Sequence, residues 1–347
     1  MSLTKRHSLA FILLPIITAL LAGCAAPSAS NEAVSESMLK QLRSQSADLK
    51  SLGLTESGRE LRFDAAWDAP ALVRVPMLWH NDLPAVGCLI NNGRPVPLIV
   101  DTGSQGCVIE AATAVAHGMR IASGDEMRFT LAGISGSEPA LMGLPDLVSI
   151  GEWKLSRFPI LVRTRVSSVS RPMMLGPRRF EFNIWGMNPT RKLCSYMTLD
   201  YPRREVIFGF HSSYKTDAKL VWKAPLRFIG NLPHVRLKCQ DVSWTAMVDT
   251  GASSPMELDE ATAKNLKLHH LMRPAEGARI GVGSASGEKN GFLGITRIDD
   301  VEGIGPRLKN VTALVVSDRS KIGTGVLKHF RVTFDFRRDL MWVEDVK

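Results

Sequence analysis

Residues 97–104 read PLIVDTGS, and residues 246–252 read AMVDTGA. In both stretches an apolar run with strand character leads directly into Asp-Thr-Gly, and a small residue follows. One Asp-Thr-Gly is expected by chance in roughly one of ten chains of this length, and Asp and Gly also favour plain surface turns. Two copies in the same local setting indicate a pair of matched acidic loops instead.

The sequence around these loops repeats with them. The segment LPAV begins 18 residues before Asp101, and LPHV begins 17 residues before Asp249. Each motif is followed by a predicted short helix and a glycine-rich hairpin, at 110–117 and 131–136 in the first copy and at 259–266 and 281–287 in the second. Each copy closes with an apolar segment before glycine and a final hairpin, IWG then MTLD in the first and IG then VTFD in the second. Short strands dominate, so we predict an all-β chain of two pseudo-symmetric lobes with a short helix each, at 71–212 and 213–347.

Residues 1–23 are predicted to be a secretion signal. A basic start precedes an apolar run at 9–21, which contains Pro15 and is shorter than the ~20 residues that span a bilayer, so a retained transmembrane helix is the weaker alternative. The sequence LAGC at 21–24 resembles the bacterial lipobox, which implies that Cys24 is acylated and holds the protein at a membrane. An ordinary cleaved signal, in which the cysteine is incidental, is the alternative.

Residues 24–70 are rich in Ser, Ala, Glu and Gln and are interpreted as a tether. A partly ordered arm that packs on a lobe is the competing interpretation, which Leu61, Phe63 and Trp67 favour for the last third of the segment. Ala25, rather than Asp, follows the cysteine, and among bacterial lipoproteins this resemblance implies the periplasmic face of the outer membrane.

Composition favours a folded chain, because 45% of the residues are apolar and only 22% are charged. The net charge of +9 falls to +7 when the signal, with Lys5 and Arg6, is removed. No basic run is interleaved with stacking aromatics, so we expect no nucleic-acid partner. Anionic lipid head groups remain a possible neighbour, beside a merely solvated basic surface.

The remaining cysteines, His residues and glycine motifs indicate no cofactor or metal. Cys88, Cys107, Cys194 and Cys239 show no two-residue spacing typical of zinc or redox sites, and one disulfide, two or none are all compatible with the sequence. The eight histidines include no metal-ligand spacing. The GVG at 281–283 is not followed by a helix, which argues against a dinucleotide loop.

From about residue 72 to residue 346, the chain resembles the pepsin and retropepsin superfamily of aspartic peptidases, and its lobe endings resemble the retropepsin-like branch more closely. The resemblance implies two acid-protease β-barrel lobes with a cleft between them, and an extended polypeptide as substrate. It also implies a monomer, because both lobes lie in one chain, and catalysis by Asp101 and Asp249. The glycine-rich hairpins become substrate-binding flaps, which involve Gly133, Ile134, Gly136, Gly281, Val282 and Gly283.

The chemistry explains the motif. Amide hydrolysis without a covalent intermediate needs one carboxylate to take a proton from water and one carboxylic acid to polarise the carbonyl. Two carboxyls held about 3 Å apart share one proton and titrate as a pair, for which aspartic peptidases are the standard example. By the resemblance, Thr102 and Thr250 reach across to the opposite loop, and Gly103 and Gly251 bring amide donors close to the carboxylates.

The fourth residue of the motif differs between the copies. We expect Ser104 to donate a hydrogen bond to Asp101 and favour its charged form, which Ala252 cannot do for Asp249. This asymmetry predicts that Asp249 holds the shared proton and that the working pH is less acidic than that of pepsin.

Two departures from the family affect the cleft rather than the acid pair. None of the three tyrosines lies in the first flap, and Lys321 and the bulky Trp185 stand where apolar pairs are expected. The leading hypothesis is an endopeptidase acting on envelope proteins or peptides. The alternative is a catalytically silent peptide- or protein-binding lipoprotein on the same fold, and a purely structural tether explains neither motif.

Overall fold

The computed structural model describes residues 31–44, 46–47, 55–57, 60–62, 66–80, 82–122, 129–133, 136–169, 178–179, 182–268, 281–284, 287–290 and 292–346. The predicted signal, with Cys24, lies outside these residues. None of the described helices has the length and apolar character needed to cross a membrane.

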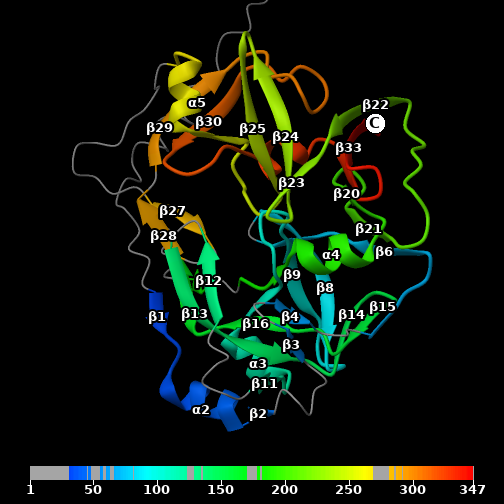
Figure 1. Ribbon diagram of the computed structural model, residues 1–347, viewed down its shortest axis with the longest axis vertical. Helices are drawn as coiled ribbons and strands as arrows, with labels where there is room; N and C mark the ends of the chain where they lie inside the picture. Colours follow the sequence, from blue (N-terminus) through cyan, green and yellow to red (C-terminus); the bar gives the residue numbers. More distant parts are fainter. Residues whose placement is uncertain are drawn as a thin grey trace, which may run out of the picture.

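The structure confirms the predicted mostly β fold (Figure 1). The N-terminal half, residues 66–209, forms most of one large curled sheet with the strand order β2-β11-β13-β16-β10-β19-β9-β8-β14-β15-β5, whose first strand, β2 (Ser46–Ala47), precedes this half. Its elements are β5 (Ala66–Asp68), β6 (Leu72–Pro76), β7 (Leu78–His80), β8 (Leu83–Ile90), β9 (Val96–Val100), β10 (Val108–Glu110), α3 (Ala111–Ala116), β11 (Arg120–Ala122), β12 (Phe129–Gly133), β13 (Gly136–Leu144), β14 (Leu147–Ile150), β15 (Trp153–Ser156), β16 (Ile160–Arg163), β17 (Arg165–Val169), β18 (Arg178–Arg179), β19 (Ile184–Trp185), α4 (Met187–Leu193), β20 (Tyr196–Asp200) and β21 (Glu205–Gly209).

The C-terminal half, residues 220–346, repeats the central part of this arrangement in a smaller sheet with the order β23-β24-β25-β31-β26-β30-β29. Its elements are β22 (Leu220–Pro225), β23 (Arg227–Ile229), β24 (Leu232–Cys239), β25 (Val242–Asp249), β26 (Met256–Asp259), α5 (Glu260–Asn265), β27 (Gly281–Ser284), β28 (Gly287–Asn290), β29 (Phe292–Ile298), β30 (Val311–Val316), β31 (Lys321–Gly323), α6 (Thr324–Leu327), β32 (Arg331–Asp335) and β33 (Leu340–Asp345). Each half therefore has more than the one helix expected. The predicted boundary at 212/213 falls in the strand-free stretch between β21 and β22, and the division into two domains stays a prediction.

Local sequence explains the hairpin that leads to each acidic loop. Asn91 and Asn92 take positive φ values of 50° and 58° between β8 and β9, a conformation that asparagine tolerates better than most residues. Gln240, with φ 54°, does the same between β24 and β25. Along β24, burial alternates after His234, so Val235, Leu237 and Cys239 face the core. The hairpins thus deliver β9 and β25 to matching places in the two halves.

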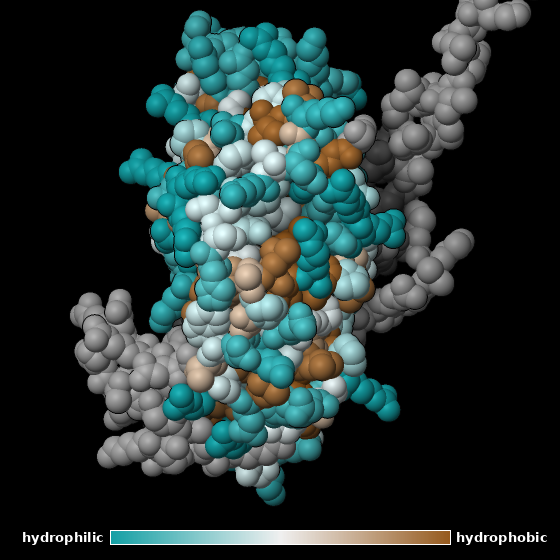
Figure 2. All heavy atoms as spheres, turned by 90° about the vertical axis from the view of Figure 1, so that its right-hand side faces the viewer, coloured by the Kyte–Doolittle hydropathy of each residue, from teal (hydrophilic) through white to brown (hydrophobic). Residues whose placement is uncertain are grey.

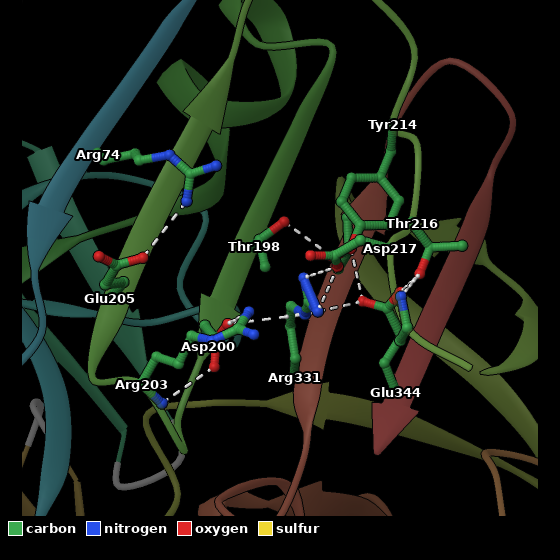
Figure 3. A network of polar contacts seen from close by, with 12 residues as sticks. Arg74, Thr198, Asp200, Arg203, Glu205, Tyr214, Thr216, Asp217, Arg331 and Glu344 are labelled. Atoms are coloured by element: carbon green, nitrogen blue, oxygen red, sulfur yellow. Dashed lines mark hydrogen bonds and ion pairs between the residues drawn. The ribbon is translucent and has the colours of Figure 1, made fainter. Parts of the chain in front are cut away.

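A six-stranded sheet, β22-β33-β32-β20-β21-β6, takes three strands from each half. At its centre β20 pairs with β32, where Thr198 lies opposite Thr333 and their hydroxyl groups are 2.7 Å apart. The buried Arg331 contacts Asp200 and Glu344 at 3.6 and 3.3 Å (Figure 3). Because Asp200 belongs to the N-terminal half and Arg331 to the C-terminal half, this ion network joins the two halves.

Part of the predicted tether packs against the N-terminal half. The helix α2 (Glu36–Ser44) contacts α3, and its Leu42 is fully buried. Strands β1 (Asn31–Ala33) and β2 (Ser46–Ala47) pair with β17 and β11, while β3 (Thr55–Ser57) and β4 (Glu60–Arg62) pair with each other. The described residues between 31 and 47 thus pack on the N-terminal half, and in the last third of the segment Ala66–Asp68 pairs with β15. That residues 24–70 act as a tether stays a prediction.

The surface is polar with scattered apolar side chains. Figure 2 shows one face as mainly hydrophilic, with small apolar groups separated by polar residues. The large apolar side chains that are most exposed among the described residues are Trp67, Leu78, Trp79, Leu89, Leu220 and Ile229. The four cysteines in the described part of the chain are free and buried, so the disulfide question that the sequence left open is answered there by unpaired thiols.

Candidate active site

The two acidic loops leave the ends of β9 and β25, and each strand runs parallel to a short strand that comes much later in the sequence. Ile99 and Val100 of β9 pair with Ile184 and Trp185 of β19. In the other half, Asp249 at the end of β25 pairs with Gly323 of β31. This equivalent placement explains why the sequence repeat extends to the glycine-containing segments near the end of each half.

The two threonines lock the loops together with four hydrogen bonds that are related by pseudo-symmetry. The Thr102 hydroxyl donates to the Val248 carbonyl at 2.6 Å, and the Thr250 hydroxyl donates to the Val100 carbonyl at 2.5 Å. Each hydroxyl also accepts the other threonine's backbone N–H at 3.0 Å. Both threonines are fully buried. This crossing is the role that the family resemblance implied for them.

The glycines after the threonines leave room for the carboxyl groups. The N–H of Gly103 donates to Asp101 at 2.8 Å, and the N–H of Gly251 donates to Asp249 at 3.0 Å. A Cβ added at Gly103 would lie 2.5 Å from the Asp249 carboxyl, and one added at Gly251 would lie 2.4 Å from the Asp101 carboxyl. Each carboxyl therefore sits against the glycine of the opposite loop, which brings the two acids together as predicted.

The two acids differ in their surroundings. Asp101 is partly exposed, whereas the Asp249 residue is only 5% exposed. Burial raises the pKa of Asp101, and the neighbouring Asp249 raises it further, while the Gly103 N–H and the Lys321 ammonium oppose the shift. The net effect raises the pKa of Asp101 to about 8. The direction of this shift is the one expected for two carboxyls that share a proton.

Lys321 is the site residue whose role sequence reasoning missed. Its Nζ lies 3.0 Å from Oδ2 of Asp249 and 3.8 Å from Oε2 of Glu257, and the lysine is only 2% exposed. Burial lowers the pKa of Lys321, but the carboxylates of Asp249 and Glu257 outweigh this, and the net effect raises it. The available signal was a charged residue in a position expected to be apolar.

The contacts of Ser104 differ from those expected. The Ser104 hydroxyl donates to the Gly106 carbonyl at 3.0 Å rather than to Asp101, because that acceptor lies two residues along the same loop. The asymmetry that the structure does show is the contact with Lys321, whose Nζ lies 3.0 Å from Oδ2 of Asp249. The expected hydrogen bond from Ser104 to Asp101 is therefore wrong, so the contrast between Ser104 and Ala252 does not set the two acids apart. That Asp249 holds the proton stays a prediction, and the position of Lys321 argues against it.

Trp185 belongs to the core rather than to an opening. It is 1% exposed, packs edge-on against Trp153 and donates from its indole N–H to the Thr190 hydroxyl at 3.0 Å. The expectation that its bulk alters the substrate cleft finds no support in these contacts.

The predicted flaps are hairpins. β12 pairs with β13 so that Gly133 faces Gly136, and β27, which contains Gly281, Val282 and Gly283, pairs with β28. Ile134 lies outside the described residues. That these hairpins bind substrate stays a prediction.

Within the described ranges, no three His, Cys, Asp or Glu side chains are grouped so that they could hold a metal ion. The acid pair has the Lys321 ammonium group 3.0 Å from Asp249, and an ammonium group is unsuited to bind a cation.

Residues 86–177 match the family model for aspartyl proteases. The matched segment contains Asp101, the hairpin β12–β13 and most of the large sheet, but not Asp249 or Lys321. A search of curated proteins found no match. The match supports an aspartyl protease relationship and, in general terms, aspartic protease activity.

Proposed function

We propose that the protein is an aspartic endopeptidase whose acid pair is Asp101 and Asp249. The observation that carries the proposal is the crossed pair of Asp-Thr-Gly loops, in which each carboxyl abuts the glycine of the opposite loop. Random surface turns would not be joined by two reciprocal threonine contacts. The aspartyl protease match of the first loop supports the same reaction class.

The roles of the two acids follow from their environments. The ionised Asp249 takes a proton from a water molecule, whose hydroxyl adds to the carbonyl carbon of the substrate. The protonated Asp101 donates a hydrogen bond, and then its proton, to the carbonyl oxygen. When the tetrahedral intermediate collapses, Asp249 gives the nitrogen of the leaving amine the proton that it took from water, and the C–N bond breaks. One hydroxyl of the intermediate returns its proton to Asp101 as the carbonyl group of the new carboxyl product forms. The pair then returns to its singly protonated state.

The substrate in this proposal is an extended stretch of polypeptide from the cell envelope. The hairpins β12–β13 and β27–β28 offer backbone groups that can pair with an extended chain. The chain acts as a monomer and reaches envelope substrates from a lipid anchor at Cys24 on the periplasmic face of the outer membrane. Mass spectrometry of the mature N-terminus tests the anchor, because the proposal predicts that the mature chain begins at an acylated Cys24.

Cleavage assays test the function. The wild-type chain, Asp101→Asn and Asp249→Asn are compared on casein and on a peptide library between pH 3 and pH 9. We expect the wild type to cleave and both variants to lose cleavage. Asp241→Asn is the matched control, because Asp241 is exposed in the turn before β25. If the wild type binds peptides but cuts none of them, the protein is the silent binding lipoprotein instead.

A further inference from the structure

The place of Lys321 in its strand has an exact counterpart in the N-terminal half. Lys321 lies two residues before Gly323 and pairs with Met247, which is two residues before Asp249. Ile184 lies two residues before Gly186 and pairs with Ile99, which is two residues before Asp101. The same strand position therefore carries an alkyl side chain beside one acidic loop and an ammonium group beside the other.

The second partner of each residue differs in the same way. Across the antiparallel pairing, Ile184 lies opposite Val108, whereas Lys321 lies opposite Glu257. Glu257 is only 6% exposed and accepts a hydrogen bond from Ser254 at 2.9 Å. The apolar pair of Ile184 and Val108 in one half thus corresponds to a buried ion pair in the other half. In that ion pair, Lys321 contacts Asp249 as well as Glu257.

Such a triad is costly to bury unless its charges balance. The charged groups that act on Lys321 are Asp249 on β25, Glu257 on β26 and Asp101 in the opposite loop. Asp318, in the turn before β31, acts on Glu257. The nearest anion to the ammonium is Asp249, at 3.0 Å, and Glu257 lies farther away at 3.8 Å.

We infer that Lys321 is a positioning residue that assigns the charges of the acid pair, an inference that rests on the proposed function. The ammonium holds Asp249 as the carboxylate and so leaves the shared proton on Asp101. Because a cation favours ionised carboxyls, Lys321 also extends the pH range in which the pair holds a single proton toward acid pH. Glu257 offsets part of the positive charge and limits this effect.

The pH profile of kcat/KM tests the inference, because a packing role would not shift it in a defined direction. Lys321→Met removes the charge from a chain of similar length, and we expect both limbs of the profile to move to higher pH by about one unit or more. Lys321→Arg keeps the charge and should move the limbs back toward the wild type. Glu257→Gln removes the compensating anion and should move the alkaline limb the opposite way, to lower pH.

Ile184→Met is the matched control, because it changes the equivalent position without changing charge, and its profile should superimpose on that of the wild type. Superimposable limbs for Lys321→Met and the wild type would overturn the inference. So would limbs that move in the same direction for Lys321→Met and Glu257→Gln.

A measurement on the wild-type chain covers the case in which Lys321→Met does not fold or no cleavage is found. The ¹³Cε resonance of Lys321 is followed by NMR from pH 5 to pH 10, after assignment with Lys321→Arg. A charged amine throughout neutral pH supports the inference, and a neutral amine at pH 7 overturns it. If the wild type cleaves nothing while Lys321 is charged, the proposed function fails and the charge assignment stands.

Discussion

Replacing Asp101 by Asn should make the folded protein more stable at neutral pH, although it abolishes catalysis. Burial and Asp249 raise the pKa of Asp101 from 3.8 to about 8 in the folded state. Between these two values the folded chain binds a proton that the unfolded chain has lost. The free energy of unfolding of the wild type therefore falls as the pH rises through this window, and the contribution is fully present only below pH 4 or so.

The size of the effect follows from the width of the window. Each pH unit between the two pKa values corresponds to about 1.4 kcal/mol in the free energy of unfolding. At pH 6, Asp101→Asn, whose side chain cannot ionise, should therefore have a free energy of unfolding about 3 kcal/mol higher than that of the wild type. The gain should be near zero at pH 4 and grow until pH 8. Above pH 8 the gain stays constant, because Asp101 is then ionised in both the folded and the unfolded wild-type chain.

Denaturant unfolding of both chains at pH 4, 6 and 7.5 measures the difference, and calorimetry checks it as a rise in Tm. Asp241→Asn should show a difference that does not grow with pH. A wild type that is the more stable chain at pH 7.5, or a gap that is the same at all three pH values, would refute a raised Asp101 pKa.

Three further predictions concern the supporting residues. Thr250→Val removes the hydroxyl that donates to the Val100 carbonyl and accepts the Thr102 N–H, so it should lower the free energy of unfolding by about 2–4 kcal/mol and reduce kcat/KM. Thr333→Val, in the shared sheet, should leave kcat/KM unchanged, and equal losses of kcat/KM in the two variants would contradict this. Ala252→Ser should leave the pH–rate profile in place, because the equivalent Ser104 donates its hydroxyl to the carbonyl two residues along the loop rather than to Asp101, and a shift toward acid would restore a role for that position. Burial raises the pKa of Cys88 to about 12, so a thiol reagent should modify it at pH 8 only after unfolding, and rapid labelling of the folded chain would show that the core is open.

The sequence predicted most of what the backbone does at the site. Asp-Thr-Gly, an apolar strand before it and a glycine-containing segment far downstream are local patterns, and each copy supported the other. The predicted helix at 259–266 is α5, which begins after Asp259 caps it by accepting the Thr262 N–H at 2.9 Å. These elements depend on short-range preferences, which a single sequence records well.

The side-chain partners depended on information that the sequence does not carry. Whether Ser104 bonds to a carboxyl or to the Gly106 carbonyl is decided by a rotation about one bond in a loop. Lys321 meets Asp249 only because β31 runs parallel to β25 in one particular register, and Glu257 joins them through a second pairing. The sequence only weakly indicates that α2 packs on the N-terminal half, because this short helix buries one leucine. The helix α3 that it contacts lies about 70 residues farther along the chain.

The symmetry of the backbone makes the asymmetry of charge informative. The threonine contacts and the glycine amides are nearly the same in the two halves, so they cannot decide which carboxyl holds the proton. The difference enters at Ile184 and Lys321. Ile184 demonstrates that an alkyl side chain is sufficient to build this strand beside an acidic loop. Burying Lys321 and Glu257 costs desolvation that the strand itself does not require, so the contact with Asp249 is best explained by what it does to the acid pair.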